Sequence, residues 1–385
     1  MKVAQLIQTM AMGGAEHLAV QIANAQAEAG NESYLYVIEG PGPLSAKIRP
    51  DVGVKYFEYR RPSLRNPFKF IKSAIKGYAL FTSQIKSNDI ELIQTHLPGS
   101  NFWGLVFAIT NKCAVVSTVH NNCEFGYGGS VSQARIKLRK NAYRQMFKKC
   151  DAVVAVSDLV AESLTAELGI KHSNKLVSVP NGVSIYPPFK LDEKNAVRDK
   201  YDIGHDELLV LAAGRHCEQK NFRALIESMG ILSNRINCRL IIAGDGPLRR
   251  THQQHAGRLG VADKVLFPGN INDLPDLMRA SDLYVMSSRW EGLPLVLLEA
   301  MACGMANVGT AIEGIEEVIV DGKSGLVVES DNPKALADAI EELLSSDQKR
   351  VEFGAVALEI VKQKYSFERV NKDLTELYNK IVKVK

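Results

Sequence analysis

Short apolar segments alternate with segments of helical periodicity along all 385 residues of this chain. In the first half the apolar segments fall at residues 3–8, 34–38, 92–95, 115–119, 152–156 and 176–179. Helical periodicity fills most of the intervals between them, notably 15–29 and 132–148. Such alternation predicts a parallel sheet with helices on both faces.

The same pattern starts again after a turn-forming cluster, Pro180-Asn181-Gly182, and a polar segment at 187–206. Apolar segments follow at 208–213, 240–243, 265–267, 283–286 and 326–328. We therefore expect an α/β fold with two doubly wound, Rossmann-like domains that face each other across a deep cleft. The first spans residues 1–182 and the second begins at 183. Ligands of such sheets bind at the carboxyl ends of the strands.

Charge is unevenly distributed between the two halves. Residues 1–180 carry 21 Lys and Arg against 13 Asp and Glu, whereas the rest carries 26 against 30. Two acid-free segments, residues 60–76 and 135–149, hold most of the excess and mix cations with apolar residues. They suit peripheral association with an anionic membrane, and a solvated helix face is an equal alternative. No recognisable nucleic-acid module accompanies the charge, which disfavours a nucleic-acid partner.

Neither a targeting segment nor a cysteine framework stands out. The six cysteines are scattered without a CxxC pair, so reduced thiols are expected. The apolar run near Met1 is too short for a signal peptide, and no run of about 18 apolar residues occurs. We expect a cytoplasmic protein, with the inner face of the membrane as its possible docking surface.

Polar residues and glycines follow several strands of the first predicted domain. Gly13 and Gly14 precede a helix, where backbone amides can approach an anion; a tight turn without a ligand is the alternative. His120 and Asn121 follow the strand at 115–119, and Thr95-His96 ends another. His120 can bind a hydroxyl or phosphate, although a lone histidine often only satisfies its neighbours. Thr95, His96 and Asn121 are assigned to acceptor binding.

In the second domain, Gly214-Arg215 and Lys220 follow the strand at 208–213. Two cations so placed can converge on a diphosphate, and a pair of solvated cations is the alternative. Asn270 and Ile271 follow the strand at 265–267, where exposed backbone groups can read the edge of a base.

Two carboxylates, Glu291 and Glu299, flank the start of a further helix, in the segment EGLPLVLLEAMACG. Pro294 suits the first helical position. Glu299 lies about one turn into the helix and can reach a ribose, and both acids can accept hydrogen bonds from hydroxyls. The alternative is a capping acid and a surface glutamate.

Together these motifs resemble retaining glycosyltransferase family 4, which has the two-domain GT-B fold. The resemblance covers nearly the whole chain and rests on the order of Gly13-Gly14, His120, Asn181-Gly182, Gly214-Arg215 with Lys220, Gly244-Asp245-Gly246-Pro247, EGLPLVLLEAMACG and Tyr365-Ser366-Phe367-Glu368-Arg369. It implies that the second domain ends at residue 364 and that residues 365–385 form a helix that crosses back onto the first domain.

The resemblance also implies the roles of individual residues. Arg215 and Lys220 would bind the donor diphosphate, and Gly13 and Gly14 would complete this phosphate site from the other domain. Glu299 would bind the ribose. The donor sugar would be held by Glu291 and the amides of Gly292, Leu293, Pro294 and Leu295. Catalysis would fall to Glu291, His120, Arg215 and Lys220. No metal and no cofactor would be needed, because cations and helix ends would stabilise the leaving diphosphate.

The expected activity is transfer of a hexose or N-acetylhexosamine from a nucleotide donor, which is expected to be linked to UDP. The acceptor would be a saccharide or lipid-linked saccharide of a bacterial surface polymer such as lipopolysaccharide, capsule or exopolysaccharide. Two alternatives are a non-hydrolysing UDP-N-acetylglucosamine epimerase of the same fold and a nucleotide-sugar-binding regulator without turnover. Neither glycine turn is GxGxxG, which disfavours an NAD dehydrogenase.

Overall fold

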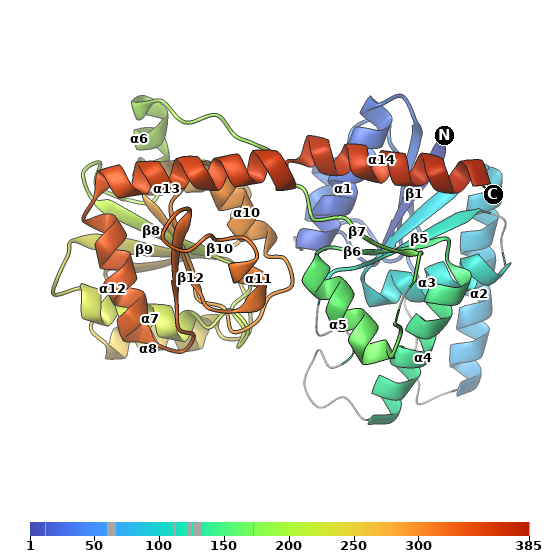
Figure 1. The fold of residues 1–385 in the computed structure, drawn as a ribbon, viewed down its shortest axis with the longest axis horizontal. Coiled ribbons are helices and arrows are strands. Elements are labelled where there is room, and N and C mark those ends of the chain that lie inside the picture. The colour runs from blue at the N-terminus through green and yellow to red at the C-terminus, as the bar shows by residue number, and fades with distance from the viewer. Residues whose placement is uncertain are drawn as a thin grey trace. The chain divides into compact units, whose positions relative to one another are not determined.

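The structure is a computed structural model that describes residues 1–11, 13–59, 67–110, 113–121, 125, 133–171 and 173–384, apart from the side chains of residues 67–70 and 134. The chain divides into two compact units (Figure 1). Unit 1 consists of Met1–Asn181 and Val370–Lys385, and unit 2 of Gly182–Arg369. Each unit is an α/β sandwich, which confirms the predicted fold class.

The described residues of unit 1 form a seven-stranded parallel sheet in the order β3-β2-β1-β4-β5-β6-β7. Its strands are β1 (Lys2–Ile7), β2 (Glu32–Val37), β3 (Gly53–Tyr56), β4 (Leu92–His96), β5 (Ala114–Val119), β6 (Ala152–Ala155) and β7 (Leu176–Ser178). Its helices are α1 (Gly14–Glu28), η1 (Pro43–Lys47), α2 (Pro67–Ser87), α3 (Leu97–Thr110), α4 (Gln133–Lys149) and α5 (Asp158–Leu168). The strand order reverses beside β1, as in doubly wound folds.

The described residues of unit 2 form a six-stranded parallel sheet in the order β10-β9-β8-β11-β12-β13. Its strands are β8 (Leu208–Ala213), β9 (Cys238–Ala243), β10 (Val265–Gly269), β11 (Leu283–Met286), β12 (Asn307–Thr310) and β13 (Gly325–Val328). Its helices are α6 (Leu191–Asp199), α7 (Phe222–Leu232), α8 (Arg249–Arg258), α9 (Leu274–Ala280), α10 (Leu295–Ala302), α11 (Glu313–Glu316), α12 (Pro333–Leu344), α13 (Asp347–Ile360) and η2 (Val361–Tyr365).

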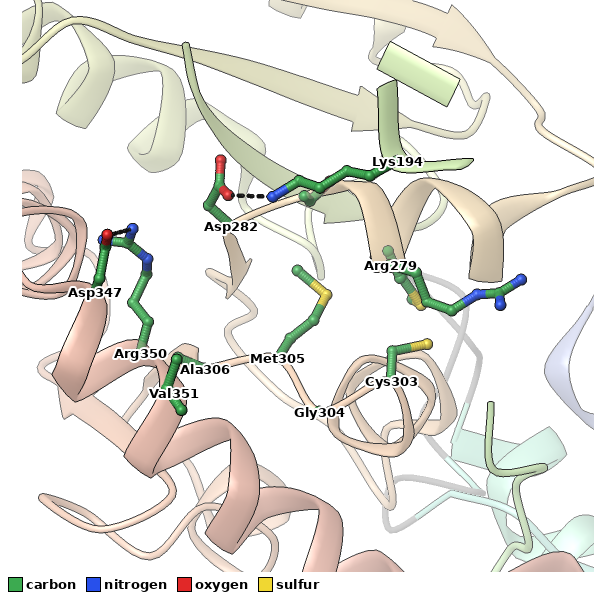
Figure 2. A pocket seen from close by; sticks show the side chains of 12 residues that line it. Lys194, Arg279, Asp282, Cys303, Gly304, Met305, Ala306, Asp347, Arg350 and Val351 are labelled. Carbon is green, nitrogen blue, oxygen red and sulfur yellow. Dashed lines mark hydrogen bonds and ion pairs between the residues drawn. The ribbon is translucent and has the colours of Figure 1, made fainter. Parts of the chain in front are cut away.

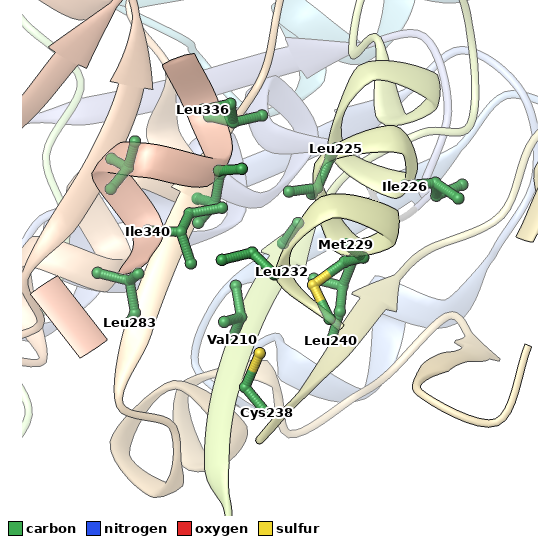
Figure 3. Packing of buried hydrophobic residues seen from close by; sticks show 14 of the residues in the cluster. Val210, Leu225, Ile226, Met229, Leu232, Cys238, Leu240, Leu283, Leu336 and Ile340 are labelled. Atoms are coloured by element: carbon green, nitrogen blue, oxygen red, sulfur yellow. The ribbon is translucent and has the colours of Figure 1, made fainter. Parts of the chain in front are cut away.

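Helices α7 and α12 cover one face of the unit 2 sheet and bury an aliphatic core against it (Figure 3). Val210 of β8, Leu225 of α7 and Ile340 of α12 are all fully buried there. The apolar positions of α7 and α12 recur at helical spacing, which explains why these segments form helices on this face. The core fixes β8 and the start of α7, the two elements that flank the Gly214–Lys220 segment.

Two strands in the structure have no counterpart among the predicted ones. β3 is a short edge strand whose central residues, Val54 and Lys55, are exposed, so it lacks an apolar pattern. β12 reads Asn-Val-Gly-Thr, and the side-chain amide of its buried Asn307 donates to the Met305 carbonyl. Both strands are held by pairing with neighbours, a contribution that local sequence does not reveal.

Glycines at the ends of β8 and β9 allow two turns to pack directly against each other. Gly214 has φ +152° and Gly244 has φ +124°. The Gly214 N–H donates to the Ala243 carbonyl and the Gly244 N–H to the Gly269 carbonyl. A Cβ atom at Gly244 would overlap the Gly214 carbonyl oxygen. The backbone leading out of β8 therefore depends on a glycine in the next turn.

A buried pair of histidines lies beneath these turns. His216 Nδ1 is 2.9 Å from His252 Nδ1, and Phe222 and Phe267 surround the His216 ring. Burial, with smaller effects of the His252 and Arg249 charges, lowers the pKa of His216 to about 4. One ring must donate and the other accept, so the pair cannot take up a second proton at Nδ1 without losing this bond.

The last helix, α14 (Phe367–Val384), is shared by the two units, since its residues from Val370 onward belong to unit 1. Within unit 1, Tyr378 is fully buried. The buried Gln26 of α1 donates to Asn371 Oδ1 and Thr375 Oγ1, both at 2.9 Å. The end of the chain therefore completes the interior of unit 1.

Substitution of Gly244 by alanine is expected to lower the free energy of unfolding by about 3 kcal/mol, through positive-φ strain and the clash with Gly214. Gly257 is the matched control, because it lies exposed in α8 and a Cβ there meets no atom within 4 Å. Gly257→Ala should stabilise by about 0.5–1 kcal/mol. Urea unfolding measures both changes, and a Gly244→Ala protein as stable as wild type would contradict this account of the turn.

Acidification should destabilise unit 2 through His216. The unfolded state binds a proton near pH 6.5, whereas the folded state resists it down to about pH 4, so stability present above pH 6.5 is lost as the pH falls. From pH 7 to pH 5 the contribution of His216 is on the order of 2 kcal/mol. His216→Asn should therefore show a weaker pH dependence of urea unfolding. His205→Asn, which alters a half-exposed ring bonded to Asp199, should behave like wild type. Equal pH dependence in all three proteins would exclude this role.

Candidate active site

Lys220 and Glu291 meet at the carboxyl edge of the unit 2 sheet. Lys220 lies in the segment after β8, and Glu291 lies in the segment after β11, the strand that pairs with β8. Lys220 Nζ is 2.6 Å from Glu291 Oε1, and their side chains are 15% and 8% exposed. The strand order reverses between β8 and β11, the position where doubly wound sheets bind ligands.

Two further side chains hold the Glu291 carboxylate. Ser288 Oγ donates to Oε1 at 2.6 Å, and Gln219 Nε2 contacts Oε2 at 3.3 Å. Gln219 also donates to the Trp290 carbonyl at 2.9 Å, which joins the two segments directly. Glu291 thus accepts hydrogen bonds from three side chains and has a fixed orientation. Neither Gln219 nor Ser288 was predicted, since no motif in the sequence marks them.

A network on the outer side of this site connects its two segments to the start of α12. The Arg289 guanidinium forms an ion pair with Asp331, and Asn221 Nδ2 donates to Asp331 Oδ1 at 3.0 Å. Asn221 and Asp331 both have left-handed backbones, with φ +47° and +57°. Ser287 Oγ donates to the Lys220 carbonyl at 2.9 Å. The backbone on both sides of the Lys220–Glu291 pair is therefore anchored.

The Lys220 side chain packs closely over Gly214, since a Cβ atom at Gly214 would lie only 3.0 Å from Lys220 Cε. Arg215 next to it is exposed and pairs with none of the residues that the structure describes. Its guanidinium is exposed, and binding of a diphosphate by it stays a prediction, whereas the Lys220 ammonium already has one partner. Asn270 and Ile271 follow β10 at the same edge of the sheet, exposed and half-buried respectively.

The backbone from Gly292 to Pro294 is buried, and Leu295 is half-buried. Pro294 was expected at the first helical position; α10 instead begins at Leu295, and Pro294 is its N-cap with ψ 95°. Glu299 is half-buried on α10, and its charge contributes, after burial, to raising the pKa values of Tyr186 and Tyr284. Contact of Glu299 with a ribose stays a prediction.

In unit 1, His120 and His96 are brought together at the ends of β5 and β4. His120 Nε2 is 3.3 Å from His96 Nδ1. Burial lowers the pKa of His120 to about 4, and burial together with the His120 charge holds the pKa of His96 well below its usual value. Both rings are therefore neutral near pH 7. His120 and Asn121 are half-buried, so each still reaches the surface of unit 1.

Thr95 and His96, predicted to bind an acceptor, are fully buried. The Thr95 hydroxyl donates to Asn101 Oδ1 at 2.7 Å, so this side chain is engaged inside unit 1. His96 contacts His120 and Gln5. Direct contact of either residue with an acceptor stays a prediction, and in this structure both act as interior supports.

Gly13 is the N-cap of α1, and Gly14 is its first residue. The Glu16 carboxylate folds back over this helix start, where a Cβ at Gly13 would overlap it. Thr9 Oγ1 contacts Glu16 Oε1 at 3.2 Å, and burial raises the pKa of Glu16. An anion that bound the Gly13 and Gly14 amides would need Glu16 to move or to be protonated.

A cavity of about 640 Å³ opens beside this turn, at the carboxyl ends of β1, β2 and β3. Its lining includes Thr9, Glu39 and Glu58 together with Pro41 and Pro43. Gln8 Nε2 donates to Glu39 Oε1 at 2.8 Å. No sequence motif pointed to this cavity, because its walls come from three separate strand ends.

Figure 2 shows another cavity, of about 370 Å³, in unit 2. It lies where β11 and β12 begin, since Asp282 and Ala306 line it, and so it is remote from the strand ends that carry Lys220 and Glu291. The cations in its wall are matched by acids, Lys194 by Asp282 and Arg350 by Asp347. This cavity is separate from the candidate active site.

None of the helices in the described ranges is sufficiently long and apolar to cross a bilayer. Among the same residues, no group of three or more His, Cys, Asp or Glu side chains is placed to hold a metal ion.

The sequence matches two protein families in tandem. Residues 12–185 match the family described as Glycosyltransferase Family 4, and residues 193–359 match Glycosyl transferases group 1. A curated relative is N-acetyl-alpha-D-glucosaminyl L-malate synthase of Bacillus anthracis, 24% identical over 97% of this chain and 95% of the relative. Lipopolysaccharide core biosynthesis mannosyltransferase LpsB of Rhizobium meliloti is 27% identical over 62% of this chain and 68% of LpsB.

Solved structures show the same fold. Alr3699/HepE of Anabaena, crystallised with UDP and glucose, has a TM-score of 0.83 at 19% identity and covers 98% of this chain and 99% of its own. WaaG, a glycosyltransferase of lipopolysaccharide biosynthesis, has a TM-score of 0.74 at 20% identity over 98% of this chain and 99% of WaaG. With both halves matched in sequence and the fold shared, this chain is an enzyme of glycosyltransferase family 4 with the GT-B fold.

Proposed function

We propose that this enzyme transfers a hexose or N-acetylhexosamine from a nucleotide donor, most simply a UDP-sugar, with retention of configuration. The acceptor is a saccharide or lipid-linked saccharide in the synthesis of a bacterial surface polysaccharide. The observation that carries the proposal is the Lys220–Glu291 pair at the switch point of the unit 2 sheet. UDP as the donor nucleotide is supported by the likeness to a structure that contains UDP and glucose.

The chemistry follows from the charges at this edge. The Lys220 ammonium has three donor protons, of which one is directed to Glu291, so two remain for phosphate oxygens. Arg215, exposed beside it, supplies a forked donor to the same phosphates. Negative charge grows on the diphosphate as the glycosidic bond breaks, and cations already fixed in place stabilise it. We propose that these side chains meet this need without a metal.

Glu291 is assigned to the sugar rather than to the diphosphate. Its carboxylate faces Lys220, Ser288 and Gln219, and its remaining lone pairs can accept hydrogen bonds from sugar hydroxyls. A carboxylate held by three donors is a poor nucleophile, so we assign Glu291 to orientation of the sugar and not to a covalent intermediate. Retention rests on the family resemblance.

The acceptor is placed in unit 1. The 640 Å³ cavity has room for a saccharide, and its lining pairs the carboxylates of Glu39 and Glu58 with the apolar surfaces of prolines. Carboxylates accept hydrogen bonds from sugar hydroxyls, and apolar surface covers the faces of a sugar ring. His120, half-buried at the end of β5, is the residue of this unit that we assign to the reaction itself.

Lys220→Gln should weaken donor binding by about 10- to 100-fold, because it removes a charge-assisted bond to phosphate. Its amide can still donate to Glu291, so the fold is retained. In a thermal-shift assay with UDP-glucose, UDP-N-acetylglucosamine and GDP-mannose, the preferred donor at about 100 times its dissociation constant stabilises wild type by about 2.7 kcal/mol. At that concentration the variant should be stabilised by only about 0.4–1.4 kcal/mol.

The matched control is Arg223→Gln, which removes an exposed cation of α7 paired with Glu227. It should respond to the donor as wild type does, and its rate of transfer should be unchanged. Transfer by Lys220→Gln at the wild-type rate and with wild-type donor affinity would reject the site. No shift of wild type with any UDP-sugar, together with a shift by GDP-mannose, would reject only the choice of nucleotide.

We also propose that the enzyme works at the cytoplasmic face of the membrane and binds it through α2. Along this helix Ile71, Lys72, Ile75, Lys76 and Leu80 are all exposed, so one stripe carries both apolar and basic side chains. The helix has no acidic residue. This combination fits a bilayer with anionic headgroups.

The second basic segment, residues 135–149, offers fewer exposed cations for contact with a membrane than its composition suggested. On α4, Lys140 pairs with Glu167 at 2.9 Å and Arg144 donates to the Leu168 carbonyl, so both are committed within unit 1. Arg135, Lys137 and Leu138 remain exposed. Residues 60–66 of the first segment lie outside the described residues.

Ile75→Gln with Lys76→Gln should abolish most cosedimentation with vesicles of phosphatidylcholine and phosphatidylglycerol, since each basic residue near such a surface contributes about 1 kcal/mol. Lys190→Gln with Leu191→Gln, an exposed pair at the start of α6, is the matched control and should bind like wild type. Pure phosphatidylcholine should bind none of the proteins. Equal sedimentation of both variants would exclude α2 as the docking surface.

A further inference from the structure

A line of buried polar side chains connects His120 to the last helix of the chain. His120 Nε2 contacts His96 Nδ1 at 3.3 Å, and His96 Nε2 contacts Gln5 Oε1 of β1 at 2.9 Å. His96 and Gln5 have no exposed surface. Among these residues, therefore, only His120 meets solvent.

The line continues from Gln5 to the C-terminal helix and back into the sheet. Gln5 Nε2 donates to the Tyr378 hydroxyl of α14 at 3.5 Å, the longest bond of the line. The Tyr378 hydroxyl donates to Gln94 Oε1, and Gln94 Nε2 donates to Thr118 Oγ1 at 2.8 Å. Tyr378, Gln94 and Thr118 are at most 2% exposed. All of these residues belong to unit 1.

In each hydrogen bond of this line, the donor and the acceptor can be assigned. Tyrosine has a single hydroxyl proton, which Tyr378 gives to Gln94, so its oxygen is left to accept from Gln5 Nε2. Gln5 must then present its oxygen, Oε1, to His96. Because an amide oxygen can only accept, His96 Nε2 carries a proton.

The same assignment of donors and acceptors fixes which nitrogen carries the proton in each imidazole ring. His96 is fully buried and its pKa lies well below its usual value, so it keeps one ring proton, and that proton is on Nε2. Its Nδ1 is an acceptor, which requires a proton on His120 Nε2. His120, with a pKa of about 4, is likewise neutral, and its own Nδ1 is left without a proton.

We propose that Gln5, His96 and Tyr378 are positioning residues that hold His120 in the Nε2-protonated tautomer, so that Nδ1 accepts a hydrogen bond from a substrate hydroxyl. This deepens the proposed function, on which the role of His120 in transfer rests. A ring nitrogen with a lone pair attracts the proton of a hydroxyl and repels a phosphate oxygen. The sequence left both ligands open for His120, and the line of bonds selects the hydroxyl.

The tautomer can be measured without any substrate. In a protein labelled with 15N-histidine, long-range proton–nitrogen correlation spectra separate protonated from unprotonated ring nitrogens. The chain has eight histidines, and a His120→Gln variant assigns the His120 signals by their loss. At pH 7, Nε2 of His120 should resonate as a protonated nitrogen and Nδ1 as an unprotonated one. The opposite pattern would overturn the proposal.

Tyr378→Phe tests the far end of the line with the loss of one oxygen atom. Without the hydroxyl the Gln5 amide is free to turn over, so both His120 nitrogens should move towards intermediate shifts. Tyr36→Phe is the matched control, because Tyr36 is also a buried tyrosine of unit 1 but bonds to Asn88 and the Gln84 carbonyl. It should leave the His120 spectrum unchanged. Unchanged His120 shifts in Tyr378→Phe would remove Tyr378 from the mechanism.

Gln5→Met breaks the line nearer to His120 and should shift the same signals further, provided that the signals of His17, in α1 of the same unit, show an intact fold. If Gln5→Met left both His120 nitrogens as in wild type, the proposal would fail. In transfer assays Tyr378→Phe should lower kcat by about tenfold, the value of one misdirected hydrogen bond, with the KM for the donor unchanged. A mixed tautomer with full activity would leave the line of bonds in place and reject the role of His120 in the proposed function.

Discussion

The pairing of β8 with β11 is the constraint on which the candidate active site of unit 2 depends. These strands are neighbours in the sheet, with Leu283 opposite Val210, although β9 and β10 separate them in sequence. The segments that follow these two strands therefore lie side by side, and Lys220 of one segment forms an ion pair with Glu291 of the other. A buried carboxylate and a buried ammonium would each be costly alone. Together they form a site that is folded and charged before any ligand arrives.

The organisation of both units could be predicted from sequence because apolar strands and amphipathic helices alternate with strong periodicity. Most strands were located to within two residues, including Leu208–Ala213 and Leu283–Met286, whose bounds agree. β3 and β12 were not predicted, because their residues are exposed or polar and their strand geometry comes from pairing with neighbouring strands. Sequence periodicity reports burial, and these two strands have too little apolar surface to produce a signal.

The candidate site was predicted as a set of residues but not as a set of contacts. Arg215, Lys220, Glu291 and Glu299 were predicted to share one site, yet nothing in their spacing indicated that Lys220 binds Glu291, 71 residues away. His216, which follows Arg215, has its ring turned inward onto His252. Thr95 and His96 similarly lie inside unit 1 although they end a strand. Side-chain direction at a strand end alternates between surface and interior, and only the packed structure determines it.

Helix α14 affects the order in which the protein can fold on the ribosome. Unit 1 needs Tyr378, Asn371 and Thr375 to satisfy the buried amides of Gln5, Gln94 and Gln26, yet these residues are made about 190 positions after the rest of unit 1. At roughly 5–20 residues per second, the delay is on the order of 10–40 s. During that interval the first half of the chain carries buried amides without their native partners. Completion of its interior therefore requires that the intervening residues 182–369 have already been synthesised.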